Sequence, residues 1–415
     1  MQTTTIPDPA APSAVDRGVR PPVLTAPLVR LFVTSFGAMA TFYLLLPVVP
    51  GYAAEAAGRG SVPLGDGTAA GLSTGAMMAS TVLLEPAVPW LLRRCGNRAV
   101  IAAGLALLGV PALLLALSPG LPAVLAACLA RGAGLAVLVV AGTAITAVLV
   151  PPSRRGEAMG LYGLIVGVPG VLFLPLGVWA TARWGYPVVF VAGGAVVLAA
   201  LAAVPGLPRR AVADGPAHVP AGPGAPAPAG SPVARCGLGR PATAFAAVTL
   251  AAGVLATFLP LAVPARLDAV VALGLLAQSV VTPVARWVAG RLEHRIAPGR
   301  VLGPALVACA AGVALLTLAG SPVAVVAGCA SFGLGFGLAQ HASLVLMLDA
   351  VAPADYDRAS AVWNLAYDGG MGIGAVGFGV LTGALGYPAG FAITAVVILL
   401  ALAPIRSVAR QAAAR

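Results

Sequence analysis

Long apolar segments recur along the whole chain, and they limit the fold more than any other feature of the sequence. A helix needs about 20 consecutive apolar residues to cross the hydrocarbon core of a bilayer. Dividing the chain at arginine clusters and at Gly, Pro and Asp breaks leaves such segments at 27–50, 69–91, 98–117, 121–149, 156–181, 186–205, 241–264, 267–290, 300–319, 322–349, 358–384 and 387–405. These twelve segments predict an all-α integral membrane protein with twelve transmembrane helices.

The composition agrees with a membrane protein and argues against several other classes. Of the 415 residues, 60% are hydrophobic and only 9% are charged, whereas a soluble domain carries about 25% charged residues. The five cysteines show no CxxC spacing and no nearby histidine, so we expect no disulfide and no metal site. The chain has no Walker A motif and no Ser/His/Asp signature, which predicts neither an ATP-driven motor nor an enzyme, and no cofactor besides a coupling proton.

The arginines indicate how the helices are oriented. All 24 basic residues are arginine. If the N-terminus is cytoplasmic, about nineteen of them fall on the cytoplasmic side, and about three, Arg59, Arg183 and Arg266, fall outside. This bias predicts a protein of the bacterial cytoplasmic membrane with both termini inside. It also accounts for the net charge of +11 without a nucleic-acid partner, because the arginines form no basic stripe with interleaved aromatics.

A stretch rich in Pro, Gly and Ala at 206–240 divides the apolar segments into two blocks of six. This composition is typical of a flexible linker. We therefore expect an N-terminal bundle at 27–205 and a C-terminal bundle at 241–405, with a disordered cytoplasmic tail at 1–26 and a second cytoplasmic tail at 406–415.

The two blocks also resemble each other. Segment 155–190 begins RGEAMGLYG and ends GYPVVF, and segment 358–391 begins RASAVWNLA and ends GYPAGF. Two six-helix halves that repeat in parallel around a long central loop are the architecture of major facilitator transporters.

Loop sequences before the third and ninth spans strengthen this resemblance to the major facilitator superfamily, which covers nearly the whole chain. The family signature reads approximately G-x-L-a-D-r-x-G-r-r, and the resemblance implies that its Asp latches the cytoplasmic gate. Here Arg93 and His294 stand where that Asp is usual, which implies a latch built differently. The matching residues of the two copies are Arg93, Arg94, Gly96, Arg98, Gly290, Arg291, His294 and Arg295.

Two further segments resemble export proteins of the family. The stretch 357–379 is similar to helix eleven of arabinose-efflux-type and drug-export permeases. The fifth span resembles the Gly/Pro-rich signature of family antiporters, with Leu174 in place of the Gly before the Pro, and its motif consists of Gly167, Gly170, Pro175 and Gly177. The resemblance implies a monomeric transporter that exports small molecules by proton antiport through alternating access.

Carboxylates inside the apolar spans are few, which makes them candidates for proton coupling. Glu85 lies in the second span and Asp368 in the eleventh, and in this fold those two helices are neighbours. We expect this pair to include the proton-carrying group. The alternative is that each carboxylate is held by Arg131, a backbone amide or water as part of the structure.

Other polar groups inside the spans are candidates for a substrate cavity. Arg131 resembles the family's helix-four arginine near the middle of the membrane, where a charge is costly unless it faces a cavity or a partner. The further candidates are Tyr43, Gln278, His341 and Asn364. Each of these could instead form an ordinary hydrogen bond between helices, and the glycines inside the spans predict close helix packing.

The expected substrate is a small, fairly apolar organic molecule, because few charges are available to hold an anion or a sugar. Two alternatives stay open. One is a proton-coupled uptake symporter for a sugar, an amino acid or an organic acid. The other is a membrane scaffold or sensor that transports nothing, for which ionisable residues inside the spans would be needlessly costly.

Overall fold

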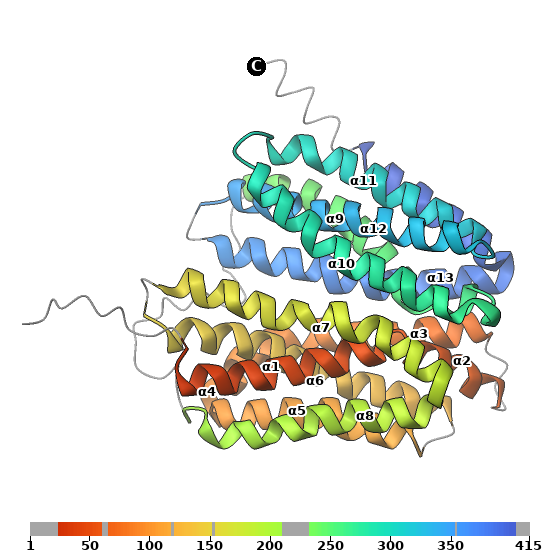
Figure 1. Ribbon diagram of the computed structural model, residues 1–415. Coiled ribbons are helices and arrows are strands. Elements are labelled where there is room, and N and C mark those ends of the chain that lie inside the picture. The colour runs from red at the N-terminus through yellow and green to blue at the C-terminus, as the bar shows by residue number, and fades with distance from the viewer. Residues whose placement is uncertain are drawn as a thin grey trace, which may run out of the picture.

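The computed structural model describes residues 24–59, 65–117, 120–151, 154–209, 232–352 and 355–403 (Figure 1). Every regular element in these ranges is a helix. The first half contains α1 (Ala26–Leu45), α2 (Val49–Gly58), α3 (Asp66–Leu84), α4 (Val88–Cys95), α5 (Asn97–Leu115), α6 (Leu121–Leu149), α7 (Arg155–Trp184) and α8 (Tyr186–Ala199). The second half contains α9 (Pro232–Ala262), α10 (Asp268–Leu292), α11 (Pro298–Leu315), α12 (Pro322–Asp349) and α13 (Tyr356–Leu400).

Most of the two predicted tails and of the predicted linker lies outside the described residues. Within 206–240, the chain from Pro232 onward already belongs to α9. The second half therefore begins its first helix earlier than the composition alone indicated.

The helices confirm the predicted number of membrane spans. In the described part of the chain, 11 helical segments are long and apolar enough to cross a membrane. The last of them, Arg358–Leu400, contains a sharp break at Gly386, where φ is 75°, and so counts as two spans. Gly185 has a φ of 78° between α7 and α8. Both glycines precede the repeated Tyr-Pro pair, and both take a left-handed conformation that costs other residues energy.

Prolines divide two of the predicted spans into shorter helices. Pro47 lies between α1 and α2, and Pro86 lies in the 3-10 turn Glu85–Ala87 between α3 and α4. A proline ring removes a backbone donor and clashes with the preceding turn of a helix. Glu85 consequently lies at a break in the second span rather than inside a regular helix.

The two halves lie side by side, with α1 to α8 in one group and α9 to α13 in the other (Figure 1). Within the halves, α5 packs against α6 and α8, and α12 packs against α10 and α11. Between the halves, α3 packs against α13 and α7 packs against α10. These two helix pairs frame the space between the halves.

The helices have one end rich in arginine. Arg93 and Arg98 flank the turn between α4 and α5, and Arg300 lies in the first turn of α11. Arg59 and Arg266 lie at the other end. We name the two the arginine-rich end and the opposite end.

Close backbone contacts join the two halves at the opposite end. A methyl group on Gly71 would collide with the carbonyl group of Ala375, and a methyl group on Gly75 would collide with the Val376 side chain. Nearby, the buried hydroxyls of Thr74 in α3 and Thr257 in α9 are hydrogen-bonded at 2.9 Å. Small residues allow helices in a membrane to approach this closely. The opposite end is therefore shut between α3, α9 and α13.

Replacing Gly71 by leucine is expected to open the opposite end, because a side chain there cannot fit against the Ala375 carbonyl. The measurement uses a cysteine at position 74 in a cysteine-free background. With Gly71→Leu, this cysteine should react with an impermeant maleimide at least about tenfold faster than without it, which corresponds to destabilising the closed state by about 1.4 kcal/mol. Gly58→Leu is the control, since nothing lies within 4 Å of a Cβ there. Equal labelling in Gly71→Leu and Gly58→Leu would contradict the packing.

Candidate functional site

A cavity of about 780 Å³ lies between the two halves. Its first-half wall comes from α1 and α7, and its second-half wall comes mainly from α10, α12 and α13. Gly160, near the start of α7, and Arg291, near the end of α10, both line it. Since both of these residues are near the arginine-rich end, the cavity extends toward that end and away from the shut one.

The first-half wall is apolar and rich in glycine. The lining residues on this side are Tyr43, Leu46, Gly160, Tyr162, Gly163, Leu164, Val166, Gly167, Gly170, Val171 and Leu174. A Cβ atom on Gly160, Gly163 or Gly167 would meet no heavy atom within 4 Å, and one on Gly170 would lie 3.2 Å from the Tyr43 ring.

These glycines widen the cavity, which corrects the expectation that the glycines of the spans serve close packing. Gly177, also part of the antiporter-like motif, does match that expectation, because a methyl group there would collide with the carbonyl group of Leu44. Pro175 lies within α7 between the two kinds of glycine. One motif on one helix therefore serves two different purposes.

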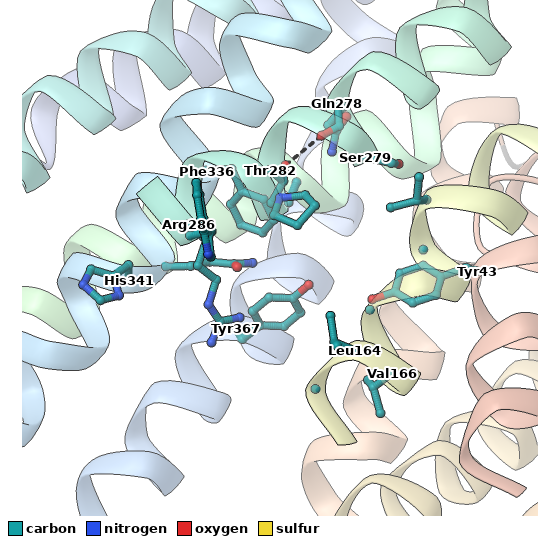
Figure 2. A pocket seen from close by; sticks show the side chains of 18 of the residues that line it. Tyr43, Leu164, Val166, Gln278, Ser279, Thr282, Arg286, Phe336, His341 and Tyr367 are labelled. Carbon is teal, nitrogen blue, oxygen red and sulfur yellow. Dashed lines mark hydrogen bonds between the residues drawn. The ribbon is translucent and has the colours of Figure 1, made fainter. Parts of the chain in front are cut away.

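The second-half wall carries the polar groups (Figure 2). They are Gln278, Ser279, Thr282, Arg286, Arg291, Gln340 and His341. The Thr282 hydroxyl donates to the Gln278 carbonyl at 2.8 Å and reaches the Gly333 carbonyl at 3.2 Å, which holds α10 against α12. The Gln278 Oε1 atom accepts no hydrogen bond from the described residues. Tyr43 lies across the cavity from this wall.

Two of the three basic groups in this wall have partners of their own. His341 Nε2 in α12 lies 3.1 Å from Glu293 Oε2, just past the end of α10. The Arg291 guanidinium lies 4.4 Å from the centre of the Trp287 ring, a cation–π contact. Within the described part of the chain, Arg286 forms no ion pair, and its side chain is exposed toward the cavity.

Glu85 and Asp368 lie beside the cavity rather than in its wall. Glu85 begins the 3-10 turn directly after α3, Asp368 lies in the neighbouring helix α13, and the two are close enough for their charges to repel each other. Tyr43 and Tyr367 line the cavity and both interact with the charge of Asp368. Neither carboxylate forms an ion pair with a basic group of the described residues. The carboxylate pair thus lies outside the lining of the cavity.

Arg131 does not line this cavity, although the sequence suggested that it would. Its side chain is 1% exposed inside the first half, and its Nε and Nη2 atoms have no hydrogen-bond partner among the described residues. Among the described residues it forms no ion pair, so it does not hold Glu85 or Asp368. Asn364 is also absent from the lining, and its Nδ2 atom donates to the Ser360 carbonyl at 2.9 Å.

The first loop motif is tied to its own half of the molecule. The Asn97 backbone N–H donates to the Arg209 carbonyl at 3.0 Å, and Arg98 Nε donates to the Leu207 carbonyl. Gly96 turns the chain between α4 and α5 with a φ of 79°. The Arg94 guanidinium lies 5.7 Å from the Trp90 ring centre. Arg93 is exposed.

The second loop motif lies at the mouth of the cavity. Gly290 and Arg291 line the cavity there, whereas His294 and Arg295 are exposed. Among the described residues, neither motif forms a hydrogen bond or an ion pair across the two halves. The described contacts therefore do not link the two loop motifs to each other in this conformation.

Sequence reasoning missed several residues that form the wall. It left Arg286 unassigned inside a span and passed over the aromatic residues Trp287, Phe336, Trp363 and Tyr367. A signal for Arg286 was present, because it lies four and eight residues after Thr282 and Gln278 along one helix. The aromatic residues resemble ordinary span residues and carry no such signal.

Comparisons with known proteins agree with this geometry. The family model described as Major Facilitator Superfamily matches residues 31–356. No curated protein sequence matches the chain at a significant level. The crystal structure of the nucleoside transporter NupG is similar at a TM-score of 0.71 and 15% identity, covering 92% of this chain and 99% of that one.

Two further solved structures show the same fold. The peptide transporter POT is similar at a TM-score of 0.73 and 15% identity, covering 92% of this chain and 94% of that one. A bacterial homolog of the human lysosomal transporter Spinster, in an inward-facing and occupied conformation, is similar at a TM-score of 0.69 and 16% identity. The match covers 92% of this chain and 96% of that one. The chain therefore belongs to the Major Facilitator Superfamily, as a multi-pass membrane transporter of a small-molecule substrate and not an enzyme.

Proposed function

We propose that this transporter exports a small, largely apolar organic molecule in exchange for protons, by alternating access. The observation that carries the proposal is the carboxylate pair Glu85 and Asp368, which lies next to a large, mainly apolar cavity without entering its wall. A proton site beside a substrate site allows the two to influence each other through the groups between them.

The two ends of the molecule support alternating access. Close backbone contacts such as that of Gly71 with Ala375 shut the opposite end, and the cavity extends to the arginine-rich end. The positive-inside rule favours a cytoplasmic location for the arginine-rich end. The conformation is then inward-facing, ready to take up a molecule from the cytoplasm or from the inner leaflet. We also expect a monomer in a bacterial cytoplasmic membrane with both termini inside.

The surroundings of the carboxylates support proton coupling. An uncompensated charge within a membrane span is costly, and neither Glu85 nor Asp368 has a basic partner among the described residues. Binding a proton removes that cost. Tyr367 lines the cavity and is the chain neighbour of Asp368, which supplies a route by which substrate and proton occupancy influence each other.

Uptake by proton symport is the second candidate. The sequence pointed to few polar groups for a hydrophilic solute, yet the second-half wall brings Gln278, Ser279, Thr282 and Gln340 together. A wall of this kind also suits the hydroxyl groups of a sugar or the backbone groups of an amino acid. The direction of proton movement separates the two candidates.

The test is compound-dependent proton flux in proteoliposomes that contain a pH-sensitive dye, with a panel of hydrophobic drugs and sugars. We expect protons to move opposite to the compound. Movement in the same direction would establish symport, and no flux with any compound would refute proton coupling. Protein-free liposomes are the control, because weak acids and bases carry protons across a bilayer unaided.

A further inference from the structure

We propose that the transported molecule is an amphipathic organic anion and that Arg286 binds its carboxylate or equivalent acidic group. The proposal rests on the proposed function only in that the cavity is taken as the site through which the substrate passes. It specifies the substrate class further: the sequence predicted a fairly apolar molecule, and we now infer that this molecule also carries a negative charge.

The position of Arg286 calls for a counter-ion. It lies six residues before the end of α10, which places it about 9 Å inside the helix end at 1.5 Å per residue. A guanidinium at such a depth in a membrane protein usually faces a partner charge or a watery cavity that binds one. In the described part of the chain no carboxylate pairs with Arg286, and its side chain opens into the cavity.

The other basic groups do not compete for this role. Arg291 stacks on the Trp287 ring and His341 is paired with Glu293, while Arg131 is enclosed in the first half. Arg286 is thus the basic group of the wall that has neither an ion pair nor an aromatic ring against its guanidinium among the described residues. Its planar fork of donors matches the two oxygens of a carboxylate.

The charge of the wall also decides against cationic substrates. Neither an Asp nor a Glu lines the cavity within the described part of the chain. Glu85 and Asp368 are not among the residues that line the cavity. An organic cation would therefore meet like charge at Arg286 and Arg291 and would lack an acidic partner.

The remaining surface fits an apolar body attached to the acidic group. Trp363 donates its indole N–H to the Ser343 hydroxyl at 3.0 Å and stacks on Phe245, with ring centres 4.7 Å apart. Its polar group is thereby satisfied away from the cavity, and what it offers to a ligand is an apolar ring. Phe336 adds a second ring, and the glycine-lined face of α7 leaves room opposite. Pockets that combine an apolar lining with a few placed polar groups bind molecules of this kind.

The experiment measures binding to the purified full chain in detergent through the quenching of tryptophan fluorescence, to which Trp287 and Trp363 contribute from the cavity wall. The probes are phenylbutyrate, phenylbutyramide and phenylbutylamine, which share one apolar body and differ in charge. We expect phenylbutyrate to bind at least about tenfold more tightly than the other two, which corresponds to about 1.4 kcal/mol. Arg286→Gln removes that preference and leaves the amide within about twofold, and Arg286→Lys retains most of it. Arg266→Gln, at the opposite end, is the matched control.

Several results would overturn the proposal. They are equal affinity for the three probes, preference for the amine, an unchanged preference in Arg286→Gln, and no binding by any carboxylate from phenylacetate to phenyloctanoate. The comparison of the three probes on the unsubstituted protein decides the question even if Arg286→Gln fails to fold. Because binding in detergent involves no gradient, this test is independent of transport direction and proton coupling. A failed flux experiment with intact carboxylate preference would refute the proposed antiport alone.

Discussion

Asp368→Asn is expected to abolish proton-driven transport while leaving substrate exchange between vesicles at equal pH intact. The amide keeps the size of the carboxylate but cannot change its charge. Asp368 interacts with Glu85, Tyr43 and Tyr367, and therefore connects the carboxylate pair to the cavity wall. Proton flux should fall to the level of protein-free vesicles. Counterflow of labelled substrate should persist, because the cavity lining is unchanged.

Glu85→Gln tests whether the proton is bound by both carboxylates together or by Asp368 alone. If the two carboxylates act as a pair, each single replacement impairs proton flux and the double replacement is no worse than Asp368→Asn. Asp349→Asn is the control, because Asp349 is exposed at the end of α12. Normal proton-driven transport in the Glu85→Gln, Asp368→Asn double variant would exclude both carboxylates as proton carriers.

Leucine at Gly177 and leucine at Gly167 should have opposite effects on stability, although the two glycines lie in one helix and one motif. At Gly177 the first added carbon already collides with the Leu44 carbonyl, and overpacking of this kind costs roughly 1–3 kcal/mol or more. At Gly167 the side chain enters open space, and replacing a helical glycine gains up to about 1 kcal/mol of helix propensity.

Transport should distinguish these variants as well. Gly167→Leu is expected to fold with an unchanged or higher Tm but to lose substrate binding, because the new side chain occupies the cavity. Gly177→Leu is expected to show a strongly lowered Tm or to fail to fold. Thermal unfolding in detergent and probe quenching measure the two effects, with Gly167→Ala as the mild control. A lower Tm for Gly167→Leu than for Gly177→Leu would show that our assignment of the two faces of α7 is wrong.

The proximity of Glu85 and Asp368 could be predicted from the sequence. The absence of an arginine partner for either carboxylate among the described residues could not. Once the repeat assigned them to the second and eleventh spans of this fold, their helices were expected to meet. Whether Arg131 reached them depended on which way each side chain of α6 faces. The hydrophobic signal around α6 is high on all sides, so it carries no information about that direction.

The helical class, the number of spans and the two-half repeat could all be predicted from the amino-acid sequence. These properties depend on sums over many residues, such as the apolar length that crosses a bilayer and the excess of arginine at one end. Local departures from the pattern do not change these predictions, and the prolines that interrupt the first and second spans are an example.

Which residues meet in the cavity could not be predicted in the same way, because it depends on how the helices pack. Arg131 and Arg286 are both arginines inside apolar spans, yet one is enclosed in the first half and the other opens between the halves. Gly167 and Gly177 belong to one motif, yet one borders open space and the other touches the Leu44 backbone. A side chain's surroundings depend on the rotation and approach of neighbouring helices. In a helix that is apolar on every face, as α6 is, hydropathy does not encode that rotation, and packing alone sets it.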